Sequence, residues 1–142
     1  GVEFVLSSLT CMRGGEIFVP KIPSVKIVDL ARVTGPDCDQ KVIGIRPGEK
    51  LHEVMISEDD ARNSLEFEDH YVIQPSYSFW NSENFQADRG GALCEDGFTY
   101  RSDTNPEWLD DTQIAELVRL VESDPIIKVK PEAGEATFFS GA

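Results

Sequence analysis

Proline and glycine divide the apolar segments of this chain into short pieces, and this limits the sheet that the chain can form. The apolar runs at residues 16–20, 41–45 and 70–73 each indicate a short strand that stops at a proline or a polar turn. A sheet built from so few short strands is narrow and has exposed edges. A mixed α/β fold is therefore expected.

Helical periodicity appears between these strands. Residues 2–12 and 24–34 carry apolar side chains at helical spacing, and Ser24 is expected to be the N-cap of the second helix. Residues 51–55 suggest one or two helical turns. Ser57, which precedes three acidic residues, is typical of another short helix start, because acids favour the N-terminal end of the helix dipole.

The last predicted helix has the clearest local signals. Asp110 suits its N-cap, and Gln113 follows three residues later as in a capping box, while Leu109 and Ile114 occupy the hydrophobic-staple positions. Apolar side chains continue at helical spacing to Val121, Pro125 ends the run, and residues 130–142 are expected to form a loose tail.

Residues 76–97 are rich in Ser, Asn, Asp and Gly, and they are interpreted as an irregular loop. Three aromatic side chains in it, Phe79, Trp80 and Phe85, are candidates to anchor the loop on the core.

The charge balance disfavours some partners. A formal net charge of −13 opposes bulk attraction to nucleic acid or anionic lipid. Residues 21–52 carry six Lys/Arg against four acids, so this neutral-to-basic segment is available for an anionic ligand, although solvated surface charge explains the same numbers. No apolar run is long enough for a bilayer, no signal peptide is recognised, and three scattered cysteines fit a reducing cytoplasm.

The segment from Arg46 to Glu53 concentrates groups that bind ligands. It places two cations, two carboxylates and an imidazole around a Pro-Gly turn that follows a predicted strand. The planar fork of Arg46 suits a phosphate, and the Glu49 carboxylate suits sugar hydroxyls. A solvated turn is the alternative interpretation of the same residues.

Other sites have weaker support. The sequence contains no glycine-rich dinucleotide motif, no P-loop and no zinc-type Cys/His spacing. The acidic pairs at residues 58–60 and 110–111 stand where helix caps need them. His52 and His70 are interpreted as structural histidines rather than as general bases.

Several ordered segments of the sequence resemble the C-terminal part of the inverting UDP-N-acetylglucosamine 4,6-dehydratases, which act in polysaccharide and flagellin glycan biosynthesis. These enzymes belong to the extended short-chain dehydrogenase/reductase superfamily. The resemblance runs from residue 1 to about residue 122 and is carried by residues 15–24, 45–53, 54–62 and 102–105 with Trp108 and Leu109. It implies an α/β substrate-binding lobe over residues 1–122 that lacks most of the Rossmann domain, followed by a variable tail at residues 123–142.

The resemblance also implies roles for residues. Arg46 matches the family arginine expected on the substrate diphosphate, and Glu49 matches the glutamate expected on the uridine ribose. Lys50 and His52 match the same motif, and they are included as substrate-binding candidates without a firm role. The family's catalytic residues and NADP site belong to a preceding portion, so no catalytic residue and no cofactor site are expected in this chain.

Three functions remain as alternatives. The first is the UDP-sugar-binding portion of such a dehydratase, inactive alone and completed by its Rossmann portion or by further copies. The second is a free-standing module that binds UDP or a UDP-sugar weakly. The third is an oligomerisation scaffold without a ligand, whose strand at residues 16–19 would lie against the missing Rossmann sheet.

Overall fold

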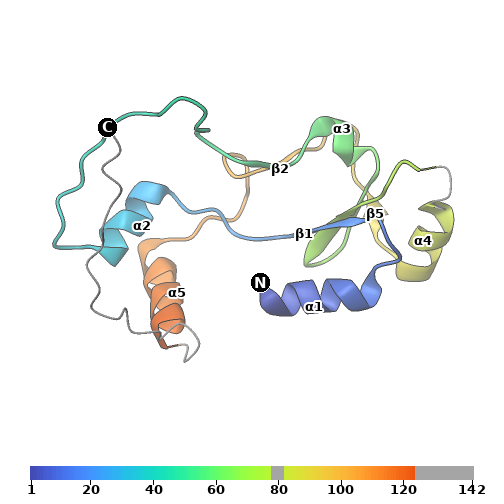
Figure 1. Cartoon of the computed structure of the whole chain (residues 1–142), viewed down its shortest axis with the longest axis horizontal. Coiled ribbons are helices and arrows are strands. Elements are labelled where there is room, and N and C mark those ends of the chain that lie inside the picture. The colour runs from blue at the N-terminus through green and yellow to red at the C-terminus, as the bar shows by residue number, and fades with distance from the viewer. Residues whose placement is uncertain (78–81, 124–142) are drawn as a thin grey trace, which may run out of the picture. The chain divides into compact units, whose positions relative to one another are not determined.

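The computed structural model of the chain describes residues 1–77 and 82–123 (Figure 1). The chain divides into two compact units. The first comprises residues 1–25 and 41–108, and the second comprises residues 26–40 and the segment from residue 109 onward.

The first unit is built on an antiparallel sheet. Its strands are β1 (Ile17–Pro20), β3 (Ser64–Glu66), β4 (His70–Ile73) and β5 (Ala92–Leu93), in the spatial order β1-β4-β3-β5. A separate antiparallel ribbon pairs β2 (Val54–Ile56) with β6 (Tyr100–Arg101). The strands predicted at residues 16–20 and 70–73 are confirmed, and they pair with each other, so β1 already has a partner within this chain.

Side-chain alternation along the strands produces two buried clusters. Val72 lies opposite Leu65 in the sheet register, and the two pack with Phe85 of α4 (Ser82–Arg89). The neighbouring residue Tyr71 joins the other cluster, which also contains Val19, Ile56, Ala61 and Tyr100. Because successive strand residues point to opposite faces, one short strand supplies both clusters.

Two helices of the first unit, α1 and α3, were predicted from the sequence. Helix α1 (Val2–Cys11) confirms the first predicted helix, and within the described structure none of its side chains is fully buried. Helix α3 (Glu58–Ala61) begins at Ser57, whose hydroxyl accepts a hydrogen bond from the Asp60 N–H at 3.2 Å. This is the N-cap that the three following acids predicted.

The second unit contains α2 (Ile27–Thr34) and α5 (Asp111–Ser123), which pack together (Figure 1). The predicted capping box is confirmed: Asp110 accepts a hydrogen bond from the Gln113 N–H, and Gln113 accepts one from the Asp110 N–H, both at 2.9 Å. Arg32 joins the helices through ion pairs with Asp29 and Asp111.

The expected N-cap at Ser24 is wrong. Helix α2 has Lys26 as its N-cap residue, and no side chain caps it. Ser24 instead donates its hydroxyl to the Ser102 carbonyl at 2.8 Å and forms a bridge with Trp108. The Ser24 hydroxyl therefore bonds to a residue distant in the sequence instead of capping the helix.

Two elements predicted around the Arg46 turn are also wrong. Residues 41–45 form no strand, and Val42 and Ile43 are 89% and 76% exposed. Gly44 has a φ of +81°, which departs from the extended conformation that a strand needs. Residues 51–55 form no helical turn, because Val54–Ile56 instead pairs with β6.

The interpretation of residues 76–97 as an irregular loop is wrong in part. This segment contains α4 and β5, and Phe85 is buried at 2% exposure, as expected of an anchor. Phe79 and Trp80 lie outside the described residues, as does the segment after residue 123. Strands β3 and β6 had no clear signal, because each has only two or three residues.

Leu65→Ala tests the smaller cluster. Leu65 is fully buried, whereas its cross-strand neighbour Leu93 is 58% exposed. Truncation of Leu65 is expected to lower the free energy of unfolding by about 3 kcal/mol, because it leaves a cavity. Leu93→Ala, the matched control, is expected to cost less than about 1 kcal/mol. Urea unfolding measures both, and equal losses would contradict this account of the core.

Candidate functional site

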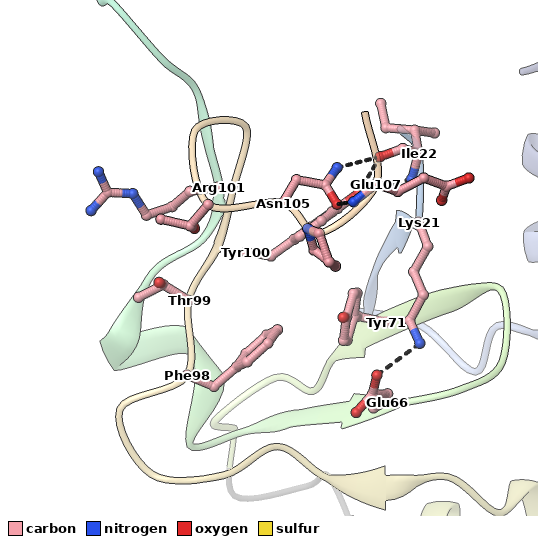
Figure 2. A pocket seen from close by; sticks show the side chains of 12 residues that line it. Lys21, Ile22, Glu66, Tyr71, Phe98, Thr99, Tyr100, Arg101, Asn105 and Glu107 are labelled. Carbon is pink, nitrogen blue, oxygen red and sulfur yellow. Dashed lines mark hydrogen bonds and ion pairs between the residues drawn. The ribbon is translucent and has the colours of Figure 1, made fainter. Parts of the chain in front are cut away.

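The first unit contains a cavity of about 290 Å³ between the end of β1 and the loop that carries β6 (Figure 2). The cavity has aromatic walls, because Tyr71 lies 5.3 Å from both Phe98 and Tyr100 between ring centroids. In Figure 2 the Phe98 ring points into the cavity, whereas the Arg101 guanidinium points away from it. Its lining comprises Lys21, Ile22, Glu66, Tyr71, Phe98, Thr99, Tyr100, Arg101, Thr104, Asn105, Pro106 and Glu107.

The rim of the cavity is fixed by hydrogen bonds to one residue, Ile22. The Tyr100 hydroxyl accepts from the Ile22 N–H at 2.8 Å and donates to the Ile22 carbonyl at 2.9 Å. Asn105 Nδ2 also donates to that carbonyl, at 2.8 Å. Pro20 and Pro23, which lack N–H groups, flank this segment. Between them the Lys21 N–H donates to the Asp69 carbonyl at 2.9 Å, whereas side chains satisfy both backbone groups of Ile22.

An ion pair lies at the base of the cavity. Lys21 Nζ is 2.7 Å from Glu66 Oε1 and 4.9 Å from the centroid of the Tyr71 ring. Burial, together with the Glu66 charge, raises the pKa of Tyr71 to about 12. Tyr71 therefore stays protonated near neutral pH, so its phenol can donate a hydrogen bond but is not available as a base.

The predicted substrate-binding turn has a defined geometry of its own. The Arg46 N–H donates to Glu49 Oε2 at 2.7 Å, and Arg46 Nε donates to Glu49 Oε1 at 2.6 Å. Gly48 has a φ of +85°, in the left-handed region that favours glycine. The Arg46 side chain is 76% exposed. The structure thus brings Arg46 and Glu49 together, and neither lines the cavity.

The hydrogen bonds of Arg46 lower the pKa of Glu49, and the backbone N–H contributes most. The carboxylate is therefore ionised at neutral pH, which is the form that accepts hydrogen bonds from hydroxyl groups.

The other two predicted residues have different partners. Lys50 Nζ lies 4.0 Å from Glu53 Oε2, on the exposed side of the turn. His52 Nε2 lies 2.8 Å from an Arg101 nitrogen, and its Nδ1 lies 3.7 Å from Asp103 Oδ2. His52 therefore connects the turn to β6 rather than to Arg46 or Glu49, which agrees with its interpretation as a structural histidine.

Sequence reasoning missed most of the cavity. Lys21 and Asn105 lie within the segments that carried the family resemblance, so a signal existed for them, although no role was assigned. Tyr71, Tyr100 and Arg101 had no local signal, because strand pairing and loop packing bring them together.

Neither a metal site nor a membrane span was found in the part of the chain that the structure describes. No group of three or more His, Cys, Asp or Glu side chains in residues 1–77 and 82–123 is arranged to hold a metal ion. No helix among these residues combines the length and the apolar character needed to cross a bilayer.

The segment that contains the cavity strand β1 and the Arg46 turn matches a known family. Residues 1–75 match the family described as "Polysaccharide biosynthesis protein", and the chain belongs to this family. This confirms the resemblance that the ordered motifs predicted.

Particular relatives narrow the comparison. The chain is 48% identical over 126 residues to a UDP-N-acetylglucosamine 4,6-dehydratase (inverting) of Campylobacter jejuni serotype O:2, covering 86% of this chain and 38% of the relative. It is 46% identical over 127 residues to the same-named protein of serotype O:23/36, with the same coverage. The chain therefore spans little more than a third of the length of these relatives.

A solved structure shares the fold. The X-ray structure of Pen from Bacillus thuringiensis superposes with a TM-score of 0.67, at 22% sequence identity, covering 84% of this chain and 36% of that one. This likeness supports the α/β fold class, and at this identity it concerns the fold alone.

The hydrogen bonds of Glu49 predict a pH response of the turn. Because its pKa is lowered from the ordinary value of a glutamate, the Glu49 carboxylate stabilises the turn above that ordinary pKa, and the contribution is lost as the pH falls through the lowered pKa. Carbon NMR titration of the Glu49 carboxyl is expected to show this.

Arg46→Ala should raise the pKa of Glu49 only part of the way back to its ordinary value, because the backbone N–H of residue 46 remains. A wild-type Glu49 that titrates at or above the ordinary pKa of a glutamate would contradict the observed geometry.

Proposed function

We propose that this chain forms the UDP-sugar-binding portion of an inverting UDP-N-acetylglucosamine 4,6-dehydratase, and that it is catalytically incomplete alone. The observation that carries the proposal is its close identity, over most of its length, to two proteins that bear that name. The chain covers about 38% of each, so the remaining portion is expected to supply the NADP site and the reacting groups.

The Arg46 turn supports this role chemically. The guanidinium is a permanent cation whose planar fork suits a diphosphate, and its exposure leaves it accessible to a ligand. Glu49 holds the Arg46 N–H through Oε2 while Oε1 accepts from the side chain. In the proposed complex the diphosphate takes over the Arg46 side chain, and Oε1 becomes an acceptor for a ribose hydroxyl.

Lys50 and His52 have supporting roles in this proposal. Lys50 adds a positive charge to the turn, which favours approach of the anionic ligand, and its ion pair with Glu53 at 4.0 Å is weak and exposed. His52 holds the end of the turn against β6. We place this chemistry in the cytoplasm, with a surface polysaccharide or flagellin glycan as the pathway's end product.

An interaction role is the alternative, and one observation favours it. Helix α1 exposes Val2, Val5, Leu6 and Leu9 to between 56% and 76%. Such an apolar face suits contact with the remaining enzyme portion or with another copy of the chain. Sedimentation velocity that shows a clean monomer would weaken the homo-oligomeric form of this alternative.

The chain alone is expected to give no turnover. Incubation with UDP-N-acetylglucosamine and NADP should yield no 4-keto product, because no residue here is assigned to hydride or proton transfer. Mass spectrometry of the nucleotide sugar measures this, and any product above the protein-free control would refute the incomplete-portion proposal.

Arg46→Ala tests ligand binding directly. Wild-type protein is expected to bind UDP-N-acetylglucosamine with a Kd on the order of millimolar, because only part of the pocket is present. Loss of the charge-assisted bonds should weaken binding about tenfold. Amide NMR shifts near residue 46 report the titration.

Arg62→Ala serves as the control for the Arg46 experiment. It removes an equal charge from a side chain whose ion-pair distances to Asp59 and Asp96 are both 3.9 Å. If both variants bind like the wild type, Arg46 does not hold the diphosphate.

A further inference from the structure

The Arg46 turn has few attachments to the rest of the first unit. Leu51 is 88% exposed, and the bond from the Glu49 N–H to the Arg46 carbonyl, at 3.1 Å, closes the turn on itself. Contact with β6 begins only at the end of the segment. There the Glu53 N–H donates to Ser102 Oγ, and the Ser102 N–H donates to the Glu53 carbonyl, both at 2.9 Å.

A side-chain network reinforces that attachment. Arg101 forms two hydrogen bonds with Asp103, from Nε to Oδ1 at 2.9 Å and from a terminal nitrogen to Oδ2 at 2.7 Å. A terminal nitrogen of Arg101 also lies 2.8 Å from His52 Nε2. The three side chains are only partly exposed, at 33% for Arg101, 36% for Asp103 and 38% for His52.

The donor inventory fixes the state of His52 in this network. A guanidinium has only donors, so His52 Nε2 must be the acceptor, and the neutral ring carries its proton on Nδ1. Nδ1 lies 3.7 Å from Asp103 Oδ2, which is beyond hydrogen-bond distance. Asp103 thus orients the arginine by hydrogen bonds and faces the imidazole as a nearby negative charge.

We propose that Arg101, held in place by Asp103, is a positioning residue for nucleotide-sugar binding: it fixes neutral His52, and through it the orientation of the Arg46–Glu49 turn. This inference rests on the proposed function, and it assigns Arg101 no contact with the ligand. The Arg101 stem also lines the cavity, so the same side chain joins the rim of the cavity to the turn.

The network makes binding sensitive to acid. Protonated His52 has donors on both nitrogens and no longer accepts from Arg101, so two cations compete for Asp103. The charged groups that face His52 in the described structure are Arg101 and Asp103, and Lys50 and Glu53 flank it nearby in the chain. The Arg101 bonds lower the pKa of Asp103, which is therefore ionised at neutral pH.

The first experiment measures the Kd for UDP-N-acetylglucosamine by NMR titration of the full 142-residue chain at about pH 7.5. Arg101→Met keeps the apolar stem and is expected to weaken binding about fivefold. Arg101→Lys should recover only part of the loss, because a lysine cannot make the forked contact with both partners. Arg62→Met, the charge-matched control, should leave the Kd unchanged.

The second experiment tests whether Arg101 acts through His52. If it does, the double variant His52→Ala/Arg101→Met binds no more weakly than His52→Ala alone. His52→Gln retains an acceptor near the Nε2 position, so it should bind more tightly than His52→Ala. Between about pH 8 and pH 5, wild-type affinity should fall, whereas that of His52→Gln should stay level.

A nucleotide sugar is used as the ligand so that only the protein changes its protonation during the pH experiment. A nucleotide sugar has no terminal phosphate, so its charge is constant over this pH range, whereas UDP itself titrates near pH 6. A fall in affinity as the pH is lowered must then come from a change in the protein and not in the ligand. An equal fall in wild-type and His52→Gln proteins would overturn the inference, as would an unchanged Kd in Arg101→Met or additive losses in the double variant.

A ligand-free measurement separates this inference from the proposed function. Nitrogen NMR of the His52 imidazole should show the Nδ1–H form in the wild type and a mixture of tautomers in Arg101→Met. If the tautomers are as expected in both proteins but the wild type binds no nucleotide sugar, the proposed function is wrong. The role of Arg101 in ligand binding is then also wrong, although its contact with His52 is confirmed. If Arg46→Ala weakens binding while Arg101→Met does not, only this inference fails.

Discussion

Strand β4 is the element on which the first unit depends. It pairs with β1 on one side and with β3 on the other, which brings residues 17–20 and 64–66 to the same short strand. Its neighbouring residues Tyr71 and Val72 enter different clusters, so the strand supplies the core on both faces of the sheet. Because β1 is fixed there, the proline-flanked segment that follows it reaches Tyr100 and closes the cavity rim.

The polar groups of this unit are largely used to hold its loops. Tyr100 and Asn105 bind the backbone of Ile22, and Arg101 binds Asp103 and His52. The Arg46 turn differs, because its charges pair with each other on an exposed loop. Exposed ion pairs contribute little stability, so an anionic ligand can replace Glu49 on the Arg46 side chain at small cost.

Local sequence patterns correctly predicted those features whose interacting groups are close together in the chain. Asp110 and Gln113 cap α5 as expected, and Ser57 caps α3. Predictions failed where a distant partner decided the outcome. Residues 41–45 were expected to form a strand but do not pair with one, and residues 51–55 were expected to be helical, whereas Val54–Ile56 pairs with β6.

The sequence by itself determined the family and the N-caps of α3 and α5, because ordered motifs and local backbone chemistry carry that information. It also predicted Arg46 and Glu49 as binding residues, and the structure brings these two together because they are three residues apart. Only the tertiary structure decided the aromatic cavity and the link from His52 to Arg101. Hydrogen-bonded partners among them are separated by up to 83 positions, and strand pairing rather than local preference brings them into contact.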